Sequence, residues 1–522
     1  MTVITDWYRD KTILVTGGTG FMGKVLLEKL LRSCPGVRRI YLLIRAKHGT
    51  EPSARIEALL KIPLFEKVIE SNPEITKKLV AVEGDLSLPE LGLQKEQKQQ
   101  LISEVNVVFN LAAALSLKAR MKDAITYNAT GTKQMLDLSL QMKQLKAFLH
   151  LSTAFCHCDY EVLGEKMYPP PHNPHDVMRA MEWLDDKSIE LITPRLLGPH
   201  PNCYTYSKRL AEALVYEYRD RIPVCIARPS IVIPALKEPL PGWVDTLNGP
   251  VGILVGAGKG VIRTMMCDGN CYAEVVPVDI AINGIIVVAW KIANEKKIEE
   301  FPVYNITSGQ IVRVTWGDVL SKTRKLVLDY PFEKTIWYPD GNIRSSWLMH
   351  YFCIVLFHYL PAYFIDFLLL LARQKRFMVR IQNRVSLGLE VLQYFALRQW
   401  QFGNEKFLAI EKTLSAEDRD VFYMGSVKFD IDDYFEKAII GSRVYCMKEP
   451  LISVPLCRRI LTVLYCLHIA SRIAFYMLVI WLLLKYVAAA RLMLNYSTQV
   501  LQHVPVIGGM VPHINGVETT GF

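Results

Sequence analysis

The sequence has no paired Cys-x-x-Cys motif, no internal repeat and no low-complexity tract. Its 11 cysteines are odd in number, which argues against a disulfide framework. Cys156-His157-Cys158 and Cys267-x-x-x-Cys271 do not have the ligand spacing of a zinc site, so we expect buried thiols and no metal. No apolar stretch precedes the first predicted strand, so we expect no signal peptide and a reducing compartment such as the cytosol.

No motif of RNA or DNA binding accompanies the positive charge of the chain, and we expect no nucleic acid as a partner. The formal net charge of +10 suits a solvated surface, anionic lipid or a phosphate-rich substrate. The length of 522 residues predicts two or three domains. Hydrophobic residues make up 51% of the chain, which is high for a soluble enzyme, so the position of this apolar excess matters.

Four glycines lie between an apolar run and a helical pattern in ILVTGGTGFMGKVLLEKLL, residues 13–31. The pattern Gly18-x-Gly20-x-x-Gly23, with a strand before it and a helix after it, is the fingerprint of dinucleotide binding. The unpaired N–H groups and the positive dipole end of the helix would face the pyrophosphate. The expected contacts are Gly17, Gly20, Phe21, Met22 and Gly23.

Strand-like and helix-like segments alternate over about the first 235 residues, which predicts an α/β fold with a doubly wound parallel sheet of the Rossmann type. The predicted strands are 11–17, 38–45, 79–84, 105–110, 146–151 and 223–228, and the main predicted helices are 22–33, 119–142 and 204–220. Residues 235–340 are irregular and rich in Gly and Pro, with another strand at 302–306. We expect this segment to cap the sheet and shape a substrate pocket.

Arg45 ends the second predicted strand, and Lys47 follows two residues later. An NAD site usually has an acidic residue at this position to bind the ribose 2′-hydroxyl, and none is present. A guanidinium binds a 2′-phosphate in a bidentate manner, so the sequence favours NADPH as the cofactor. The alternative is an exposed basic strand end.

Polar and small residues follow the third and fourth predicted strands. Asp85 can accept a hydrogen bond from the adenine amino group or cap the next segment. Asn110 and Ala112, in VFNLAA, are expected where the backbone lies against the cofactor. Asn128 interrupts a helical pattern shortly before Gly131, so we interpret it as a functional amide or a helix kink.

A hydroxyl, a phenol and an amine are predicted to converge beside the nicotinamide. Ser152 and Thr153 end the fifth strand, while Tyr204 and Lys208 lie at i and i+4 on one face of a helix. Because an adjacent ammonium favours the phenolate, we expect Lys208 to lower the pKa of Tyr204. This set of groups is typical of an acid–base site for carbonyl reduction.

A second Tyr-x-x-x-Lys pattern, Tyr330 and Lys334, lies later in the chain. Pro331 directly follows this tyrosine and disfavours a continuing helix, so the two side chains need not share a face. We therefore assign the acid–base role to Tyr204.

In chain order, TGGTGFMG, GDL, NLAA, NATGT, LSTAF, YTYSK and RPSIV resemble the extended short-chain dehydrogenase/reductase (SDR) superfamily. More narrowly, HLSTAFCH, YTYSKRLAE, ARPSIV, GKGVIRTM, EVVPVDIAINGII and the 340–450 region resemble alcohol-forming fatty acyl-CoA reductases over nearly the full length. The resemblance implies reduction of long-chain fatty acyl-CoA by NADPH to a primary alcohol and CoA, through an aldehyde. Phe155 departs mildly from the family, whose members usually carry Tyr there.

The resemblance also implies roles for individual residues. Thr153, with Ser152 as its substitute, would polarise the carbonyl. Tyr204 would deliver the proton, and Lys208 would orient the nicotinamide ribose. Asn128 would support a water relay to Lys208.

Two further pairs of residues are expected near ligands. Pro229 and Ser230 would lie near the nicotinamide by resemblance. Lys259 and Arg263, in GAGKGVIRTM, are candidates for binding the CoA phosphates, with an ordinary solvated basic loop as the alternative.

The apolar excess lies late in the chain. Residues 459–494 are long and apolar enough to span a bilayer, although three basic residues interrupt them, and we expect them to insert. For 347–372 we expect a hydrophobic helical subdomain or an interfacial surface instead. The predicted domains are 1–340 (reductase), 341–450 (helical) and 451–522 (membrane tail). The resemblance implies endoplasmic reticulum or peroxisomal membranes, with the catalytic part facing the cytosol.

Two other functions remain open at this point. A membrane-bound hydroxysteroid dehydrogenase would use the same acid–base site on a ring alcohol, although the C-terminal helical region argues against it. A catalytically idle NADPH-binding scaffold would keep the site without turnover. A sugar-nucleotide epimerase has no use for the apolar tail.

Overall fold

The structure is a computed structural model that describes residues 2–46, 49, 51–295, 299–307, 313–425 and 427–502. The chain forms two units, Met1–Arg458 and Arg459–Phe522. The boundary predicted at residue 340 therefore does not separate compact units, because the segment that follows it belongs to the first unit.

A parallel sheet of seven strands forms the centre of the first unit, in the order β11-β7-β5-β4-β1-β2-β3. Its strands are β1 (Thr12–Thr16), β2 (Arg39–Ile44), β3 (Leu79–Glu83), β4 (Val107–Asn110), β5 (Ala147–Leu151), β7 (Val224–Pro229) and β11 (Val303–Ile306). Each lies within two residues of a predicted strand, so the predicted doubly wound sheet is confirmed. After β3 the chain crosses back over the sheet to add β4 beside β1. In open α/β sheets such a reversal of strand order leaves a crevice at the carboxyl ends of the strands, where ligands bind.

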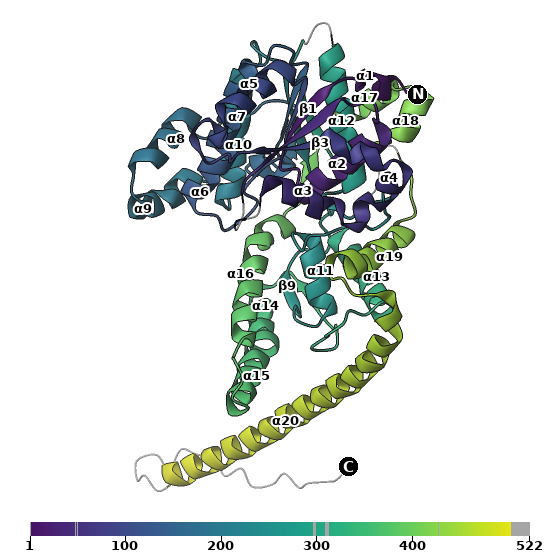
Figure 1. The fold of residues 1–522 in the computed structure, drawn as a ribbon. Coiled ribbons are helices and arrows are strands. Elements are labelled where there is room, and N and C mark those ends of the chain that lie inside the picture. The colour runs from purple at the N-terminus through teal and green to yellow at the C-terminus, as the bar shows by residue number, and fades with distance from the viewer. Residues whose placement is uncertain are drawn as a thin grey trace. The chain divides into compact units, whose positions relative to one another are not determined.

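Helices cover both faces of the sheet (Figure 1). Side chains along β1 alternate between the two cores, with Ile13 and Val15 in one and Leu14 in the other, as the period of two requires. One face packs against α5 (Lys95–Glu104), α6 (Met121–Ile125), α7 (Gly131–Leu140), α8 (Pro174–Trp183) and α10 (Cys203–Glu217). The other packs against α1 (Val3–Trp7), α2 (Phe21–Ser33), α3 (Pro52–Leu60), α4 (Glu66–Ser71) and α12 (Val278–Asn294).

The C-terminal part of the first unit completes the main core instead of forming a core of its own. Phe407, Phe422 and Tyr434 are buried in the same cluster as Ile13. The elements that carry them or lie beside them are α17 (Glu405–Thr413), α18 (Ala416–Val421) and α19 (Ile431–Gly441). A short ladder pairs β13 (Gln401–Phe402) with β6 (Val162–Leu163), which ties this segment to the loop after β5.

Apart from α12 and β11, which belong to the central layers, the described residues between 231 and 344 form short paired strands and helices. The elements are β8 (Ile231–Ile233), α11 (Pro250–Gly258), β9 (Thr264–Met266), β10 (Val275–Pro277), α13 (Trp316–Asp329) and β12 (Asn342–Arg344). β8 pairs with β10, and β9 pairs with β12. The predicted irregular segment is thus built of small elements.

A helical hairpin, residues 347–396, projects from the first unit and is called the arm below (Figure 1). Its first limb is α14 (Trp347–Ile354), a π-helical turn at 355–359, and α15 (Leu360–Leu371), and its second limb is α16 (Met378–Ala396). The first limb is mostly exposed, which fits the predicted interfacial surface better than a packed subdomain. In the described residues, Trp347–Leu371 and Leu451–Ser497 are long and apolar enough to cross a membrane. The second stretch lies on α20 (Val454–Gln502).

The approach of α19 to the loop after β8 depends on glycine. Gly242 has φ +75°, and a Cβ atom there would overlap the carbonyl group of Lys437. We predict that Gly242→Ala lowers the free energy of unfolding by about 2 kcal/mol or more, through backbone strain and overpacking. Thermal unfolding in detergent measures this change.

Gly388→Ala is the matched control, because a Cβ atom at Gly388 in α16 would meet no atom within 4 Å. It should be neutral or stabilising by roughly 0.5–1 kcal/mol. Equal melting temperatures for the two variants would contradict the account.

Candidate active site

The glycine turn between β1 and α2 lies against the segment after β4. Gly17 has φ +73°, and a Cβ atom on it would lie 2.8 Å from the backbone nitrogen of Ala112. A Cβ atom on Gly23 would overlap the carbonyl oxygen of Gly17. Gly20 begins α2 without any side chain that caps the helix, so the helix N-terminus faces the turn unscreened. Residues 17–23 therefore fit a dinucleotide pyrophosphate, with Phe21 and Met22 in the first helical turn.

Asn110 holds the turn in place. Its side-chain oxygen accepts a hydrogen bond from the Thr16 hydroxyl at 2.8 Å, and the same hydroxyl accepts one from the Ala112 N–H at 3.1 Å. The Asn110 amide nitrogen lies 3.2 Å from Nδ1 of His150. Asn110 is 1% exposed, so its observed contacts position the backbone around the glycine turn.

Two guanidiniums, only one of which we predicted, converge near the glycine turn. Arg45 is exposed at the end of β2, and its Nη1 lies 3.3 Å from the Tyr127 hydroxyl. Arg55, on α3, donates to the Arg45 carbonyl at 2.7 Å and to the Thr19 hydroxyl in the turn at 3.3 Å. Partial burial and the nearby Arg45 charge lower the pKa of Arg55. Lys47 lies outside the described residues.

The two interpretations of Asp85 and Asn128 have different outcomes. Asp85 accepts hydrogen bonds from the Ser87 N–H and hydroxyl at 2.9 and 2.8 Å, so the cap is observed and the adenine contact stays a prediction. Asn128 lies in a π-helical turn, and its amide bonds the Ala114 N–H at 2.8 Å and the Ser207 hydroxyl at 2.9 Å. Asn128 is both a helix irregularity and a buried amide, and its partner Ser207 directly precedes Lys208 on α10.

The predicted acid–base groups meet at the carboxyl end of β5. Thr153 follows this strand directly, and its hydroxyl lies near enough to the phenol of Tyr204, in the first turn of α10, to affect its pKa. Lys208, one helical turn later and 2% exposed, donates to the Leu151 carbonyl at 2.7 Å. The Ser152 hydroxyl instead donates a hydrogen bond to the Cys156 sulfur at 3.6 Å. Thr153 is therefore the hydroxyl beside the phenol, and Ser152 lies behind it.

The pKa shifts differ from the expected direction at Tyr204. Burial of its phenol and the nearby Cys156 raise its pKa above the ordinary value, and the Thr153 hydrogen bond only partly opposes them. Burial lowers the pKa of Lys208 to about 8, while Cys156 and Glu212 oppose the shift. The expected lowering of the Tyr204 pKa is not observed, because burial of the phenol raises this pKa. Tyr204 is thus held protonated, the state that a proton donor needs.

A buried ion pair lies beneath these groups. Glu212 and Arg228 are both completely buried, and the Arg228 Nε and Nη2 atoms lie 2.8 and 2.6 Å from the two carboxylate oxygens. His157 Nε2 lies 2.8 Å from Glu212, and the Cys156 thiol donates to Glu212 at 3.3 Å. Arg228 holds the pKa of Glu212 well below its ordinary value despite burial. Cys156 then connects this pair to Ser152.

Cys156, His157 and Glu212 offer atoms within 4.8 Å of one another, as metal ligands would. Both Glu212 oxygens are already engaged by the Arg228 guanidinium, which occupies the place a cation would take. We therefore interpret this cluster as a salt-bridge network.

Arg55, Glu212 and Arg228 are site residues that we did not predict. Tyr204, Lys208 and Glu212 lie at i, i+4 and i+8 in YTYSKRLAE, on one helix face, so this spacing would have identified Glu212. Arg228 lies on β7 directly before Pro229 and is the first residue of the motif RPSIV, but nothing in the sequence pairs it with Glu212. Arg55 lies in a helix far from any motif, so the sequence carries no signal for it.

The remaining candidates have unequal support. Pro229 ends β7, and the buried Ser230 hydroxyl after it has no hydrogen-bond partner among the described residues. Lys259 pairs with Glu449 at 2.7 Å, and Arg263 pairs with Asp340 at 2.8 Å. The side chains of Lys259 and Arg263 are 15% and 11% exposed, so the alternative of an ordinary solvated basic loop does not describe them. Because both are already paired, a role for Lys259 and Arg263 in phosphate binding stays a prediction with little support.

We predict that Arg228→Met destabilises the protein by about 3–5 kcal/mol, because Glu212 is left buried and unpaired. The double variant Glu212→Leu/Arg228→Met should recover much of this loss, since no charge remains in the core. Thermal unfolding of the single and double variants measures both effects.

Arg120→Met removes an exposed pairing with Asp123 and Asp186 and serves as the control, which should leave the melting temperature nearly unchanged. A melting temperature for Arg228→Met equal to that of the unchanged protein would contradict the role given to the pair.

Comparisons with known proteins agree with this geometry. The NAD-binding family model described as male sterility protein matches residues 15–285, and the Sterile model of the same description matches residues 357–449. The reductase domains from the myxalamid pathway and from a Mycobacterium tuberculosis peptide synthetase share the fold. The myxalamid reductase domain has a TM-score of 0.54 and 20% identity, over 84% of this chain and 91% of that structure. The Mycobacterium tuberculosis domain has a TM-score of 0.56 and 17% identity, over 83% of this chain and 91% of that structure.

Curated relatives with higher sequence identity are named fatty acyl-CoA reductases. Fatty acyl-CoA reductase 1 of Xenopus laevis is 36% identical over 88% of this chain and 89% of its own length. Fatty acyl-CoA reductase 2 of Mus musculus is 36% identical over 93% of this chain and 94% of its own. With the acid–base groups and the glycine turn in place, the chain belongs to the fatty acyl-CoA reductase family and is an oxidoreductase.

Proposed function

We propose that this protein reduces the thioester of a long-chain fatty acyl-CoA to a primary alcohol and free CoA, with NADPH as the reductant. The observation that carries the proposal is that the Thr153 and Tyr204 hydroxyls lie close to each other at the carboxyl end of β5. Two O–H donors at one place can bind one carbonyl oxygen. The glycine turn that fits a dinucleotide opens at the same edge of the sheet.

NADPH, when bound, would supply the hydride. Thr153 and Tyr204 donate hydrogen bonds to the oxygen that becomes negative as the hydride reaches the carbonyl carbon. Tyr204 then gives this oxygen its proton, which yields a hemithioacetal. The C–S bond breaks, CoA leaves as its thiol, and the carbonyl of an aldehyde forms again.

The aldehyde is reduced to the alcohol in the same way, after Tyr204 has taken up a proton from solvent to replace the one that it gave. The same two hydroxyls serve this step, because the oxygen occupies the same place. Thiolate is a good leaving group, so the reaction needs no covalent nucleophile on the protein. Lys208 is held against the Leu151 carbonyl beside these groups, where its ammonium can orient the nicotinamide ribose.

We predict that Tyr204→Phe abolishes formation of fatty alcohol and leaves NADPH binding largely intact, because only the proton donor is lost. Membranes that carry the protein are incubated with NADPH and a panel of acyl-CoAs, and lipid products are identified by mass spectrometry. Titration with NADPH, followed by its fluorescence, measures binding separately.

Tyr330→Phe is the matched control. Tyr330 belongs to the second Tyr-x-x-x-Lys pattern, and its hydroxyl donates to Glu436 at 2.6 Å. Tyr330 caps the C-terminus of α13, and Lys334, with φ +53°, lies outside any helix. It should retain full activity. Near-normal alcohol formation by Tyr204→Phe would contradict the acid role, and oxidation of a ring alcohol without CoA release would favour the hydroxysteroid dehydrogenase.

A preference for NADPH over NADH is part of the proposal. Arg45 and Arg55 place two guanidiniums near the glycine turn, and no acidic residue ends β2. A 2′-phosphate carries the charge that these groups favour. Tyr127 lies against Arg45, with its ring centroid 5.9 Å from the guanidinium carbon, and helps to hold it there.

We predict that Arg45→Asp and Arg55→Asp each raise the KM for NADPH by roughly tenfold or more and change the KM for NADH much less. Arg38→Asp is the control, because Arg38 is also exposed but lies at the amino end of β2, whereas Arg45 lies at its carboxyl end. Steady-state kinetics with both cofactors measures the effect. Equal losses for NADPH and NADH would contradict the 2′-phosphate site.

The apolar segment of α20 supports a membrane anchor. Within Leu451–Ser497 the most apolar window of 18 residues has a mean hydropathy of 2.1, and none of this window is buried. We infer that 459–494 insert into the endoplasmic reticulum or peroxisomal membrane and keep the reductase domain on the cytosolic side. A poorly soluble alcohol would then return directly to the bilayer.

A further inference from the structure

The arm presents an apolar surface that no described part of the first unit covers. On α15, Tyr363, Phe364, Phe367 and Leu371 are each more than half exposed. Phe377 continues this surface into the turn before α16. A contiguous patch of aromatic and aliphatic side chains of this kind marks an interaction site, because soluble surfaces rarely expose one.

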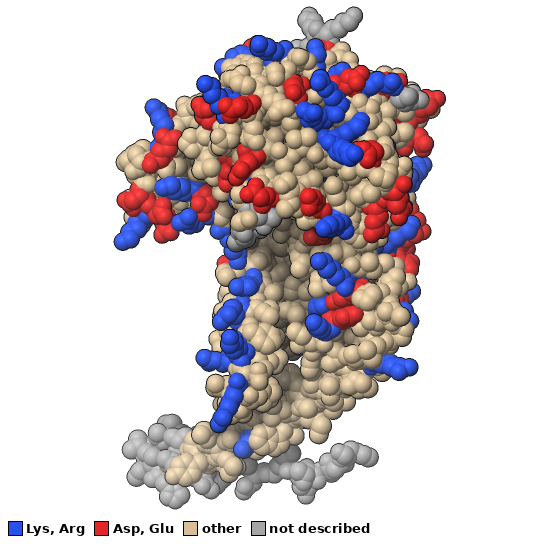
Figure 2. All heavy atoms as spheres, in the orientation of Figure 1, with Lys and Arg blue, Asp and Glu red and all other residues tan. Residues whose placement is uncertain are grey.

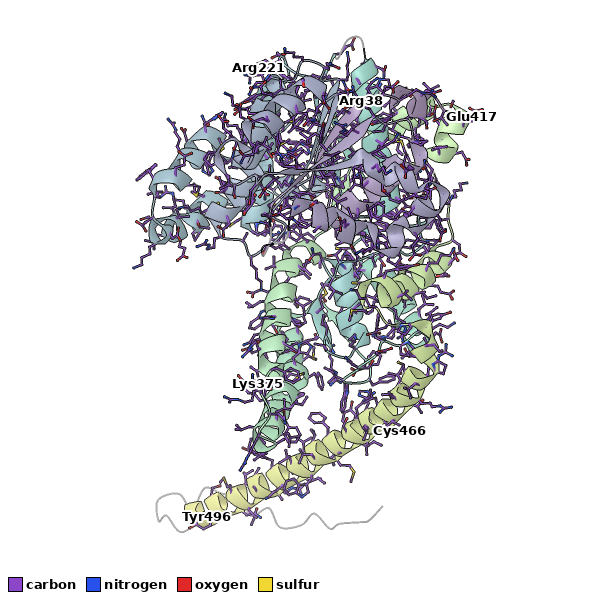
Figure 3. The ribbon with its side chains drawn as sticks, viewed as in Figure 1. Arg38, Arg221, Lys375, Glu417, Cys466 and Tyr496 are labelled. Atoms are coloured by element: carbon purple, nitrogen blue, oxygen red, sulfur yellow. The ribbon has the colours of Figure 1, made fainter. Side chains whose placement is uncertain are left out.

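Basic side chains border this apolar surface. Arg373, Lys375 and Arg376 lie in the turn between α15 and α16, and Arg380 and Arg384 follow on the exposed side of α16. None of these five forms a salt bridge with a described residue. Figure 2 shows a row of Lys and Arg side chains along one edge of the arm, and Figure 3 shows Lys375 towards its far end.

The acidic residues of the arm do not offset this charge. Residues 347–396 contain five Lys or Arg and only two acidic residues, Asp366 and Glu390. The Asp366 carboxylate is 8% exposed and accepts hydrogen bonds from the N–H groups of residues 377–379 at 2.9–3.0 Å. It therefore caps α16, fixes the turn, and is balanced by the positive end of the helix.

The base of the arm is fixed to the folded unit. His350 Nδ1 lies 2.9 Å from the Thr264 hydroxyl, and His358 Nε2 accepts the Arg263 N–H at 2.8 Å. Both histidines are buried, which leaves the 12 residues of α15 and the following turn free. Twelve helical residues span about 18 Å, against about 30 Å for a bilayer core. The first limb therefore cannot cross a membrane while its base stays bound.

We propose that the arm dips into one leaflet of an anionic membrane, with α15 in the acyl region and the basic residues of the turn and α16 at the phosphates. An apolar face beside Lys and Arg is the composition of helices that lie in the membrane interface. A hollow of about 800 Å³ between α15 and α16, lined by Phe367, Phe377, Lys375, Arg376 and Arg380, has the mixed lining that a lipid headgroup and its first methylenes require.

The test uses the full chain in vesicles, where every variant keeps its tail. Cys466, the exposed cysteine among the described residues, is replaced by Ser. An environment-sensitive fluorophore is then placed at Leu371→Cys, where the side chain is 65% exposed at the end of α15. A second preparation carries it at Leu191→Cys on α9 (Asp186–Leu197), where the side chain is 82% exposed.

In vesicles of phosphatidylcholine with about 30 mol% phosphatidylserine, the Leu371 label should shift to the blue and be quenched several-fold by lipids with a spin label on the acyl chain. The Leu191 label should stay accessible to aqueous iodide. Arg376→Glu/Arg380→Glu/Arg384→Glu should abolish the quenching at Leu371. The control Lys95→Glu/Lys143→Glu/Lys187→Glu makes the same charge change on exposed residues of the reductase part and should preserve it.

Three results would overturn the proposal. One is a Leu371 label that stays accessible to iodide in the anionic vesicles. Another is quenching that the charge-reversed arm retains in full. The third is shielding that persists in detergent together with a Leu371→Cys disulfide dimer, which would show that a second copy covers the arm. None of these readouts depends on turnover, so they are separate from the tests of the reaction.

Discussion

Glu212 and Arg228 form a salt bridge with no solvent contact, and the acid–base site is built on it. The pair connects α10, which carries Tyr204 and Lys208, to β7. Through His157 and Cys156 it also holds the chain just after β5, where Thr153 lies. A buried charge is tolerable only with its partner in place, so the three elements keep one arrangement. The proton donor therefore meets the carbonyl oxygen in a site formed before substrate arrives.

Local patterns predicted the sheet and much of the site. Buried β-branched runs between helical patterns identified the strands, since both faces of a parallel sheet are covered. Thr153, Tyr204 and Lys208 were found because strand ends and a helical spacing of four bring such groups together. Arg55 and Arg228 could not be found in this way, because each meets its partner only after the chain has folded.

Two predictions were made from local pattern alone, and tertiary contacts bear on both. The boundary at residue 340 relied on a change of pattern, but Phe407 and Tyr434 pack into the core around β1, far away in sequence. The effect of Lys208 on the Tyr204 pKa relied on adjacency along the helix, but burial of the phenol by the surrounding structure raises that pKa instead. In both cases a tertiary contact decides the outcome. Phe155, the mild departure from the family, packs edge-on against Phe402 at 5.1 Å and needs no hydroxyl.

The central claim is that one site delivers two hydrides to one carbon and releases CoA between them. The direct measurement uses NADPH that carries two deuterium atoms at C4 of the nicotinamide, with a long-chain acyl-CoA as substrate. The account predicts an alcohol with two deuterium atoms on C1, with two NADPH oxidised and one thiol released per alcohol. Oxidation of NADPH without release of thiol, or deuterium on any other carbon, would contradict it.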